Sequence, residues 1–213
     1  MANGEGITRQ RPPSSRSGKA DTDSGMTRPQ RAAVLAAERK IYSRDTEKGY
    51  IIDKNGKVIG ESEWGDNANA HFEPSKFKAL PKDAVLTHNH PGASLQQGGT
   101  VANIGLPFSS ADVNLAAGYN LSEIRAVTRG GYVYSLRRNG KTWPSQAAKE
   151  YYGEYQKIRD ANYWSYETKG TNAADKNRRT ERSALVSYTT ALKEFAKKHN
   201  LTFTRRRFAA SAR

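Results

Sequence analysis

Short apolar stretches along the middle of the chain have the length and composition of β-strands. Residues 50–52 and 58–59 flank an Asn-Gly pair at 55–56, and both residues of that pair can supply the positive φ angles of a tight turn. These two stretches therefore predict a β-hairpin. Residues 61–83 are mixed in character, so we expect a loop there with a helical turn near 75–80.

Further strands follow in the second half of the chain. They are expected at residues 84–86, 124–128, 132–136 and 201–204. The first of these is a buried strand that runs to Pro91, because proline cannot donate to a strand ladder. Glycines at 130–131 are expected to join the second and third strands.

Helices are expected between and after these strands, at residues 29–40, 109–118, 145–166 and 173–199. Pro29 suits the first turn of the first helix. Leu185, Leu192 and Phe195 recur at roughly helical spacing in the last one. Strands that alternate with helices predict an α/β fold.

Composition divides the chain into three predicted parts. Residues 1–28 are rich in Gly, Ser, Pro, Thr and Arg, which predicts a disordered tail. Residues 29–142 hold most of the predicted strands and should form the folded domain. Residues 143–213 predict a helical, basic extension. This extension carries +8 of the net charge of +14, against +3 for residues 1–31 and +3 for residues 32–142.

The basic excess of the C-terminal part could contact nucleic acid or an acidic partner. Its aromatic residues could stack on bases, or they could form the packing face of a helix. They are Tyr151, Tyr152, Tyr155, Tyr163, Trp164 and Tyr166. No apolar run of about 18 residues predicts a membrane span, and residues 1–20 have no apolar region of a secretory signal.

Two histidines at the end of the strand predicted at 84–86 are candidates for metal ligands. His88 and His90 are two residues apart, so on an extended chain both side chains point to the same side. Two imidazoles placed in this way can bind one zinc ion. The chain has no cysteine, so any zinc must be held by histidine and carboxylate. The alternative is a pair of surface histidines.

Ser109 and Asp112 open the helix expected at 109–118. A serine followed three residues later by an acid is a capping box, and the motif needs no further explanation. The same geometry places the Asp112 carboxylate in the first helical turn. There it could complete a site of two histidines and one aspartate that leaves a position open for water, as a catalytic zinc site requires.

Hydrolysis at such a site needs a general base. A carboxylate near the zinc can take a proton from water and give it to the leaving amine. Glu47 precedes the predicted hairpin, and Glu61 and Glu63 follow it. Sequence spacing does not choose among the three, and each could also be an exposed loop acid.

The run His88-Asn89-His90-Pro91, followed by Ser109-x-x-Asp112, resembles the H-x-H-P…S-x-x-D signature of the JAMM (MPN+/JAB) metalloproteases. The likeness is greatest to the RadC-like bacterial branch and to JAB-like domains of phage head-associated proteins. It covers about residues 40–142. The resemblance implies a single α/β domain with a small mixed sheet flanked by helices.

The resemblance also implies roles for the candidate residues. His88, His90 and Asp112 would hold Zn²⁺, Glu47 would be the general acid and base, and Ser109 would donate a hydrogen bond to the tetrahedral intermediate. The protein would then cleave a peptide or isopeptide bond in a protein or peptide substrate. It would act in the cytoplasm of a bacterial or phage-infected cell, or in association with the virion.

One feature departs from the family. Residues 92–108 place seventeen residues between Pro91 and Ser109, about twice the usual spacing or more. The excess is either a substrate-binding or lid loop or a sign that the site has degenerated. Two other classes of function therefore stay open. One is a nucleic-acid-binding protein in which the JAMM-like core is a scaffold, and the other is a phage-particle assembly component that keeps the metal for stability.

Overall fold

A computed structural model describes residues 25–64, 70–71, 80–91, 107–128, 131–144, 146–168 and 173–208. Helices and strands follow each other along the chain in the order α1 (Arg28–Ile41), β1 (Gly49–Ile52), β2 (Val58–Glu61), β3 (Glu63–Trp64), β4 (Ala70–His71), β5 (Val85–His90), α2 (Ser110–Gly118), β6 (Glu123–Thr128), β7 (Tyr132–Arg138), α3 (Ala147–Thr168), α4 (Ala173–Lys198) and β8 (Leu201–Arg207). The strands and helices expected from the sequence are all present among these, which confirms the α/β prediction.

Six of the strands form one mixed sheet in the order β2-β1-β5-β6-β7-β8. β5 and β6 are parallel, and the other neighbouring pairs in this sheet are antiparallel. A parallel pair needs a crossover connection, and α2 lies in the connection from β5 to β6. The carboxyl end of β5 and the start of α2 are thereby adjacent parts of one β-α-β unit.

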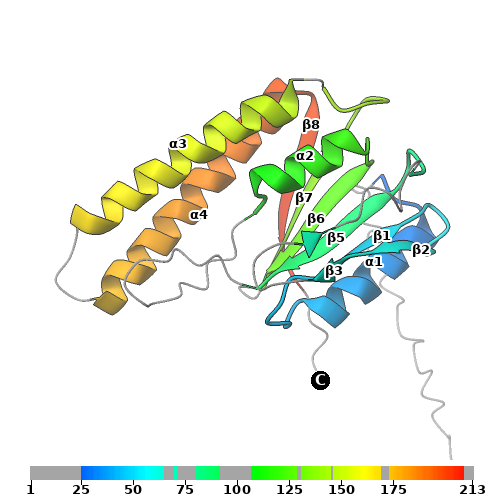
Figure 1. The fold of residues 1–213 in the computed structure, drawn as a ribbon, viewed down its shortest axis with the longest axis horizontal. Coiled ribbons are helices and arrows are strands. Elements are labelled where there is room, and N and C mark those ends of the chain that lie inside the picture. The colour runs from blue at the N-terminus through cyan, green and yellow to red at the C-terminus, as the bar shows by residue number, and fades with distance from the viewer. Residues whose placement is uncertain are drawn as a thin grey trace, which may run out of the picture.

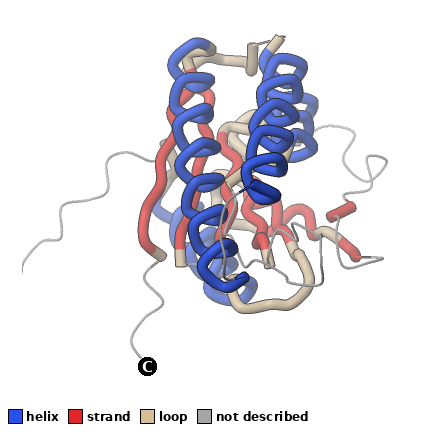
Figure 2. Tube along the Cα trace, turned by 90° about the vertical axis from the view of Figure 1, so that its left-hand side faces the viewer, coloured by secondary structure: helices blue, strands red, loops and turns tan. Residues whose placement is uncertain are grey.

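The sheet is covered by helices on both faces. In Figure 1, α1 lies on the opposite side of the sheet from α2, α3 and α4. Figure 2, viewed from the side of α3 and α4, shows these long helices in front of the strands. The last strand, β8, pairs with β7, so the C-terminal part of the chain contributes to the same sheet as the central part.

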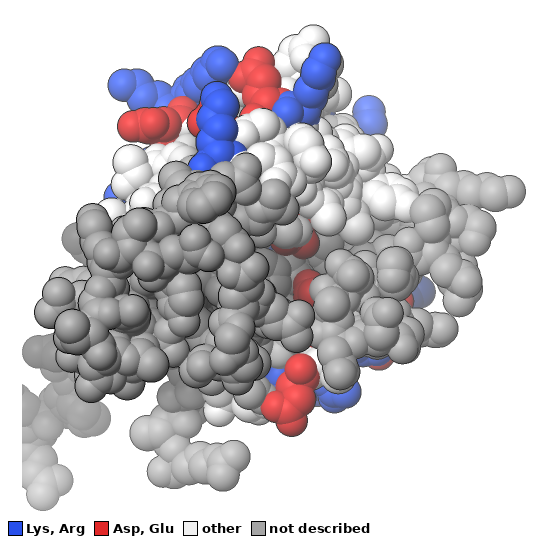
Figure 3. All heavy atoms as spheres, turned by 60° about the vertical axis from the view of Figure 1, so that its left-hand side comes forward, with Lys and Arg blue, Asp and Glu red and all other residues white. Residues whose placement is uncertain are grey.

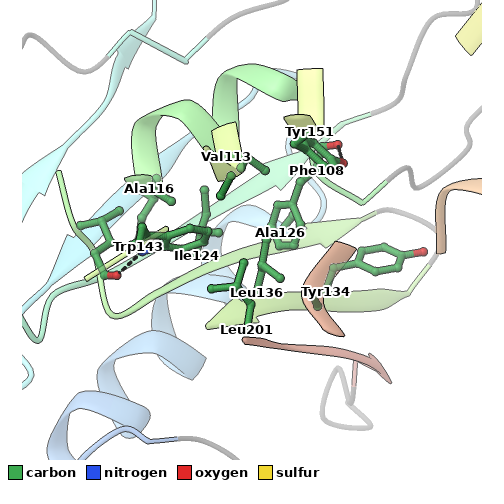
Figure 4. Packing of buried hydrophobic residues seen from close by; sticks show 14 of the residues in the cluster. Phe108, Val113, Ala116, Ile124, Ala126, Tyr134, Leu136, Trp143, Tyr151 and Leu201 are labelled. Atoms are coloured by element: carbon green, nitrogen blue, oxygen red, sulfur yellow. Dashed lines mark hydrogen bonds between the residues drawn. The ribbon is translucent and has the colours of Figure 1, made fainter. Parts of the chain in front are cut away.

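The core between the sheet and α2 is built from small and medium apolar side chains. Figure 4 shows Val113 and Ala116 of α2 facing Ile124 and Ala126 of β6. All four are fully buried. The contact fixes the position of α2 over the centre of the sheet, and with it the position of the first turn of this helix.

The hairpin turn between β1 and β2 differs from the prediction. We expected positive φ at both residues of the Asn-Gly pair, but only Gly56, with φ of 83°, has it. The Asp53 carboxylate accepts hydrogen bonds from the backbone N–H groups of Asn55 and Lys57, both at 2.9 Å, which holds the turn in another geometry. A Cβ at Gly56 would lie 2.7 Å from the Pro29 carbonyl oxygen, so glycine is required there.

Two other expectations concern the loops. Within residues 61–83, expected to be a loop, β3 and β4 form a separate two-stranded antiparallel sheet. The helical turn expected at 75–80 lies outside the described residues, apart from Leu80, and so does most of the long segment 92–108. Of the tail predicted at 1–28, the structure describes the last four residues. Thr27 is the N-cap of α1, and its hydroxyl accepts a hydrogen bond from the Gln30 N–H.

A buried ionic cluster joins α1 to its face of the sheet. The Arg125 guanidinium on β6 donates to the Glu38 carboxylate of α1 at 2.7 Å and to the Glu123 carboxylate at 2.8 Å. Glu38 also accepts from the Thr87 hydroxyl, and Glu123 from the Ser135 hydroxyl. Burial alone would lower the pKa of Arg125, but the two glutamates hold it above its ordinary range.

We expect Arg125→Met to cost about 3–5 kcal/mol of unfolding free energy, because it leaves Glu38 and Glu123 buried without a cation. Chemical denaturation of the two proteins measures the difference. Adding Glu38→Gln and Glu123→Gln to the same chain should restore much of the loss. A loss below about 1 kcal/mol for Arg125→Met alone would show that the cluster contributes little.

Candidate metal centre

The two candidate histidines lie at the carboxyl end of β5. Side chains alternate along a strand, so His88 and His90 share the face on which Leu86 contributes to the core beneath α2. Their Nε2 atoms are 2.9 Å apart, and their rings meet edge to face with centroids 4.7 Å apart. The prediction that both imidazoles point to the same side is confirmed.

Glu47 reaches the same place through the pairing of β1 with β5. The register is antiparallel and sets Gly49 opposite His88, which places Glu47 opposite His90. The Glu47 Oε1 atom lies 3.7 Å from the Nε2 of His88 and 3.9 Å from that of His90. A residue 41 positions before His88 in the sequence thus becomes a direct neighbour of both histidines.

Asp112 completes the group from the first turn of α2. Its Oδ1 is 3.1 Å from the Nε2 of His88, and its Oδ2 is 3.4 Å from that of His90. The capping box is also present: the Ser109 hydroxyl accepts from the Asp112 N–H, and the Ser109 N–H donates to the Asp112 carboxylate at 2.7 Å. Asp112 therefore caps the helix and faces the histidines at once.

Ser109 lies beside this carboxylate. Its hydroxyl donates to Asp112 Oδ2 at 2.8 Å, in addition to the contact from its backbone N–H. In this arrangement Ser109 orients Asp112, and its expected role toward a tetrahedral intermediate stays a prediction.

A tyrosine that was not expected at the site supports the segment before α2. The Tyr151 hydroxyl on α3 donates to the Phe108 carbonyl at 2.7 Å, and both rings are buried (Figure 4). Phe108 directly precedes Ser109, so this bond fixes where α2 begins. Nothing in the sequence links Tyr151 to Ser109, because the contact spans 43 positions and depends on how α3 packs.

The distances fit a metal ion. Two ligand atoms bound to zinc at about 2.0–2.1 Å in tetrahedral geometry lie about 3.3 Å apart. The two Nε2 atoms are 2.9 Å apart, and each lies near a different Asp112 oxygen, with His88 3.1 Å from Oδ1 and His90 3.4 Å from Oδ2. These separations are of the size expected for neighbouring zinc ligands. Glu47 is farther from both histidines, at 3.7 and 3.9 Å. The ligand atoms of all four residues lie within 4.8 Å of one another, so the group could hold a metal ion.

The two carboxyl groups of the cluster have different environments. Burial raises the pKa of Glu47 above its ordinary value, and the nearby histidines offset this only in part. Burial acts on Asp112 in the same direction, but the charge and hydrogen bonds of His88 and His90 hold its pKa well below the usual range. Asp112 is therefore the group held as an anion, and Glu47 is the group that accepts a proton more readily.

The site is deep but reaches solvent. The His88 side chain is 2 % exposed, whereas those of His90, Asp112 and Glu47 are 14–15 % exposed. The Nδ1 atom of His88 is buried and has no hydrogen-bond partner among the residues that the structure describes. When Nε2 binds a metal, Nδ1 carries the ring proton, and metal-bound histidines usually donate it. On this point the structure departs from a typical zinc site.

The other candidates for the general base lie elsewhere. The Glu61 side chain is 52 % exposed and forms an ion pair with Lys48. Glu63 lies in β3, outside the sheet that carries the histidines. Among the described residues, Glu47 is the glutamate that joins His88, His90 and Asp112.

Comparisons with known proteins gave no match. No protein-family model, no curated protein and no solved structure matches this chain. The likeness to JAMM metalloproteases therefore rests on the motif residues alone. Within the described ranges, none of the helices combines the length and apolar character that a membrane-spanning segment needs.

Proposed function

We propose that the protein is a zinc-dependent hydrolase that cleaves a peptide or isopeptide bond. The observation that carries the proposal is the convergence of Glu47, His88, His90 and Asp112 at one point, although they come from three separate parts of the chain. If His88, His90 and Asp112 supply three ligand atoms, a tetrahedral ion keeps a fourth position for a reactant.

The resemblance and the positions of the residues together support the following roles. His88, His90 and Asp112 would hold the ion. Zinc in such a site makes water more acidic and polarises a carbonyl group. Glu47, the more distant carboxylate, would accept a proton from water as the water oxygen adds to the carbonyl carbon. It would then give this proton to the amine nitrogen as the carbon–nitrogen bond breaks.

We expect about one zinc per chain in protein purified without chelator, measured by elemental analysis. The zinc-loaded chain should cleave members of a library of linear and ε-lysine-branched peptides in H₂¹⁸O, with one ¹⁸O entering each new carboxyl group. A chelator should stop the reaction, and returning zinc should restore it. Protein without metal that also takes up none on titration would refute the proposed function.

The structural alternative makes a different prediction. If the ion only stabilises the fold, as in an assembly component, chelation should lower the melting temperature strongly and no peptide in the library should be cut. Zinc content alone does not separate the two functions. The hydrolysis measurement does, because an assembly component would bind zinc and leave the peptides intact.

The nucleic-acid alternative finds less support. Of the three C-terminal aromatic residues whose side chains the structure describes, Tyr151 and Tyr155 pack with the hydrophobic core and Tyr152 is exposed. A groove of about 610 Å³ between α3 and α4 is lined by three lysines and three glutamates among other residues. Figure 3 shows basic and acidic side chains mixed over the upper part of the surface on this side. A face of mixed charge attracts a phosphate backbone less than a uniformly basic one.

A further inference from the structure

Asn89 stands between the two histidines and points away from them. It is fully buried, and by the alternation of β5 its side chain lies on the face that carries α1. A buried amide without partners is costly, because it loses its hydrogen bonds to water. The partners of Asn89 are therefore informative about why an amide occupies this position.

All the partners of the Asn89 amide are backbone groups of the segment that leads from α1 into β1. Its Nδ2 donates to the Thr46 carbonyl at 3.2 Å and to the Arg44 carbonyl at 3.4 Å. Its Oδ1 accepts from the Lys48 N–H at 2.6 Å. The backbone N–H of Asn89 donates to the Lys48 carbonyl at 3.1 Å. One side chain thus binds the backbone on both sides of Glu47.

The path of this segment explains why it needs such a bond. α1 lies on one face of the sheet, whereas the Glu47 carboxylate lies beside His88 and His90 on the other. Between Ile41 and Gly49 the chain leaves α1 on one face and enters the plane of the sheet beside the carboxyl end of β5, where Gly49 pairs with His88. Asn89 binds this segment from the face that carries α1, and the Glu47 carboxylate lies on the opposite face, beside His88 and His90.

We propose that Asn89 is a positioning residue that holds the segment 44–48 so that the Glu47 carboxylate stays over the metal ligands. The catalytic part of this inference rests on the proposed function. The anchoring of the segment by Asn89 does not depend on that function. The amide is suited to the task because it offers two donors to carbonyls and one acceptor to an N–H. An aspartate would keep the acceptor and, when ionised, lose both donors.

The anchoring is tested first, without metal or turnover, by residue-resolved amide hydrogen exchange. In Asn89→Ala the Lys48 amide should exchange on the order of tenfold faster, as expected for the loss of an ordinary hydrogen bond. The Leu86 amide of the same strand should change much less. Unchanged exchange at Lys48 would overturn the proposal.

The catalytic role is tested by a double-mutant cycle. Asn89→Ala should bind zinc as the wild type does, with kcat lower by about 10–100-fold and KM little changed. In a Glu47→Gln background the same change should have almost no further effect, because Asn89 acts through Glu47. A full additional loss in that background, or a loss of zinc, would show that Asn89 acts on the histidines instead.

A control separates positioning from general destabilisation. Thr87 is also fully buried on β5 and on the same face, and its hydroxyl donates to Glu38 at 3.2 Å. Thr87→Val should lower the melting temperature but leave kcat and the Lys48 exchange unchanged. Asn89→Asp serves if Asn89→Ala does not fold, and should give an intermediate exchange rate. An inert wild-type chain would refute the proposed function, while the exchange result would still decide whether Asn89 holds the segment.

Discussion

Replacing Asp112 with Asn should remove most of the bound zinc and leave the fold intact. The amide is neutral and a poor donor to a dication, so zinc affinity should fall by more than the roughly 100-fold typical of a change outside the ligand set. The amide oxygen can still accept from the Ser109 N–H, now 2.7 Å from the carboxylate, so helix capping should be largely kept. Zinc titration and thermal melting of the zinc-free proteins measure the two effects.

Ser109→Ala is the matched control for this prediction. It removes the hydroxyl that accepts from the Asp112 N–H, so it should cost about 0.5–2 kcal/mol of stability as a lost N-cap. It leaves the Asp112 carboxylate in place, so zinc should remain. If Asp112→Asn binds zinc at the wild-type level, the Ser109–Asp112 motif is only a capping box, and Asp112 is not the third ligand beside His88 and His90.

Glu47→Gln should retain zinc and lose hydrolysis by a factor on the order of 10²–10⁴, the usual contribution of a general acid or base. The glutamine cannot accept the proton from water at neutral pH. Zinc should stay because Glu47 is the most distant member of the group, 3.7 and 3.9 Å from the histidine nitrogens. The loss should appear in kcat, measured on any peptide that the wild type cleaves.

Glu61→Gln is the control for a nonspecific charge effect. Glu61 is exposed and pairs with Lys48, so its removal should leave the rate within about twofold. If Glu47→Gln is fully active and Glu61→Gln or Glu63→Gln is inactive, the assignment of Glu47 as the general base is wrong. The assignment of the zinc ligands is not affected by that result. If Glu47→Gln loses its zinc, Glu47 is a ligand and not the base.

The local parts of the site could be predicted from the sequence. His88 and His90 share a face because of the two-residue period of a strand, and Ser109 and Asp112 meet because of the geometry of a helix start. Both relations hold within a few residues, where backbone geometry alone decides. Most of the secondary structure was predictable for the same reason, but β3 and β4 were not, because each is only two residues long and shows no apolar pattern.

The choice of Glu47 over Glu61 and Glu63 was not predictable in this way. It depends on the register of β1 against β5, and a shift of one residue would turn the Glu47 side chain to the other face of the sheet. The bond from Arg125 to Glu38 spans 87 positions, and no local pattern indicates it. Asn55 kept a negative φ because the Asp53 carboxylate provided another way to close the turn.

The proposed metal ligands come from β5 and from α2, so the sequence between these elements must bring its two ends together. The cost of closing a chain segment rises only with the logarithm of its length, and each doubling adds about 0.6 kcal/mol. The seventeen residues between Pro91 and Ser109 are about twice the usual spacing, or more, of the JAMM signature that the chain resembles. Because packing of α2 on the sheet already holds the two ends together, the extra length costs folding only about 0.6 kcal/mol for each doubling. A long insertion is therefore compatible with an intact site.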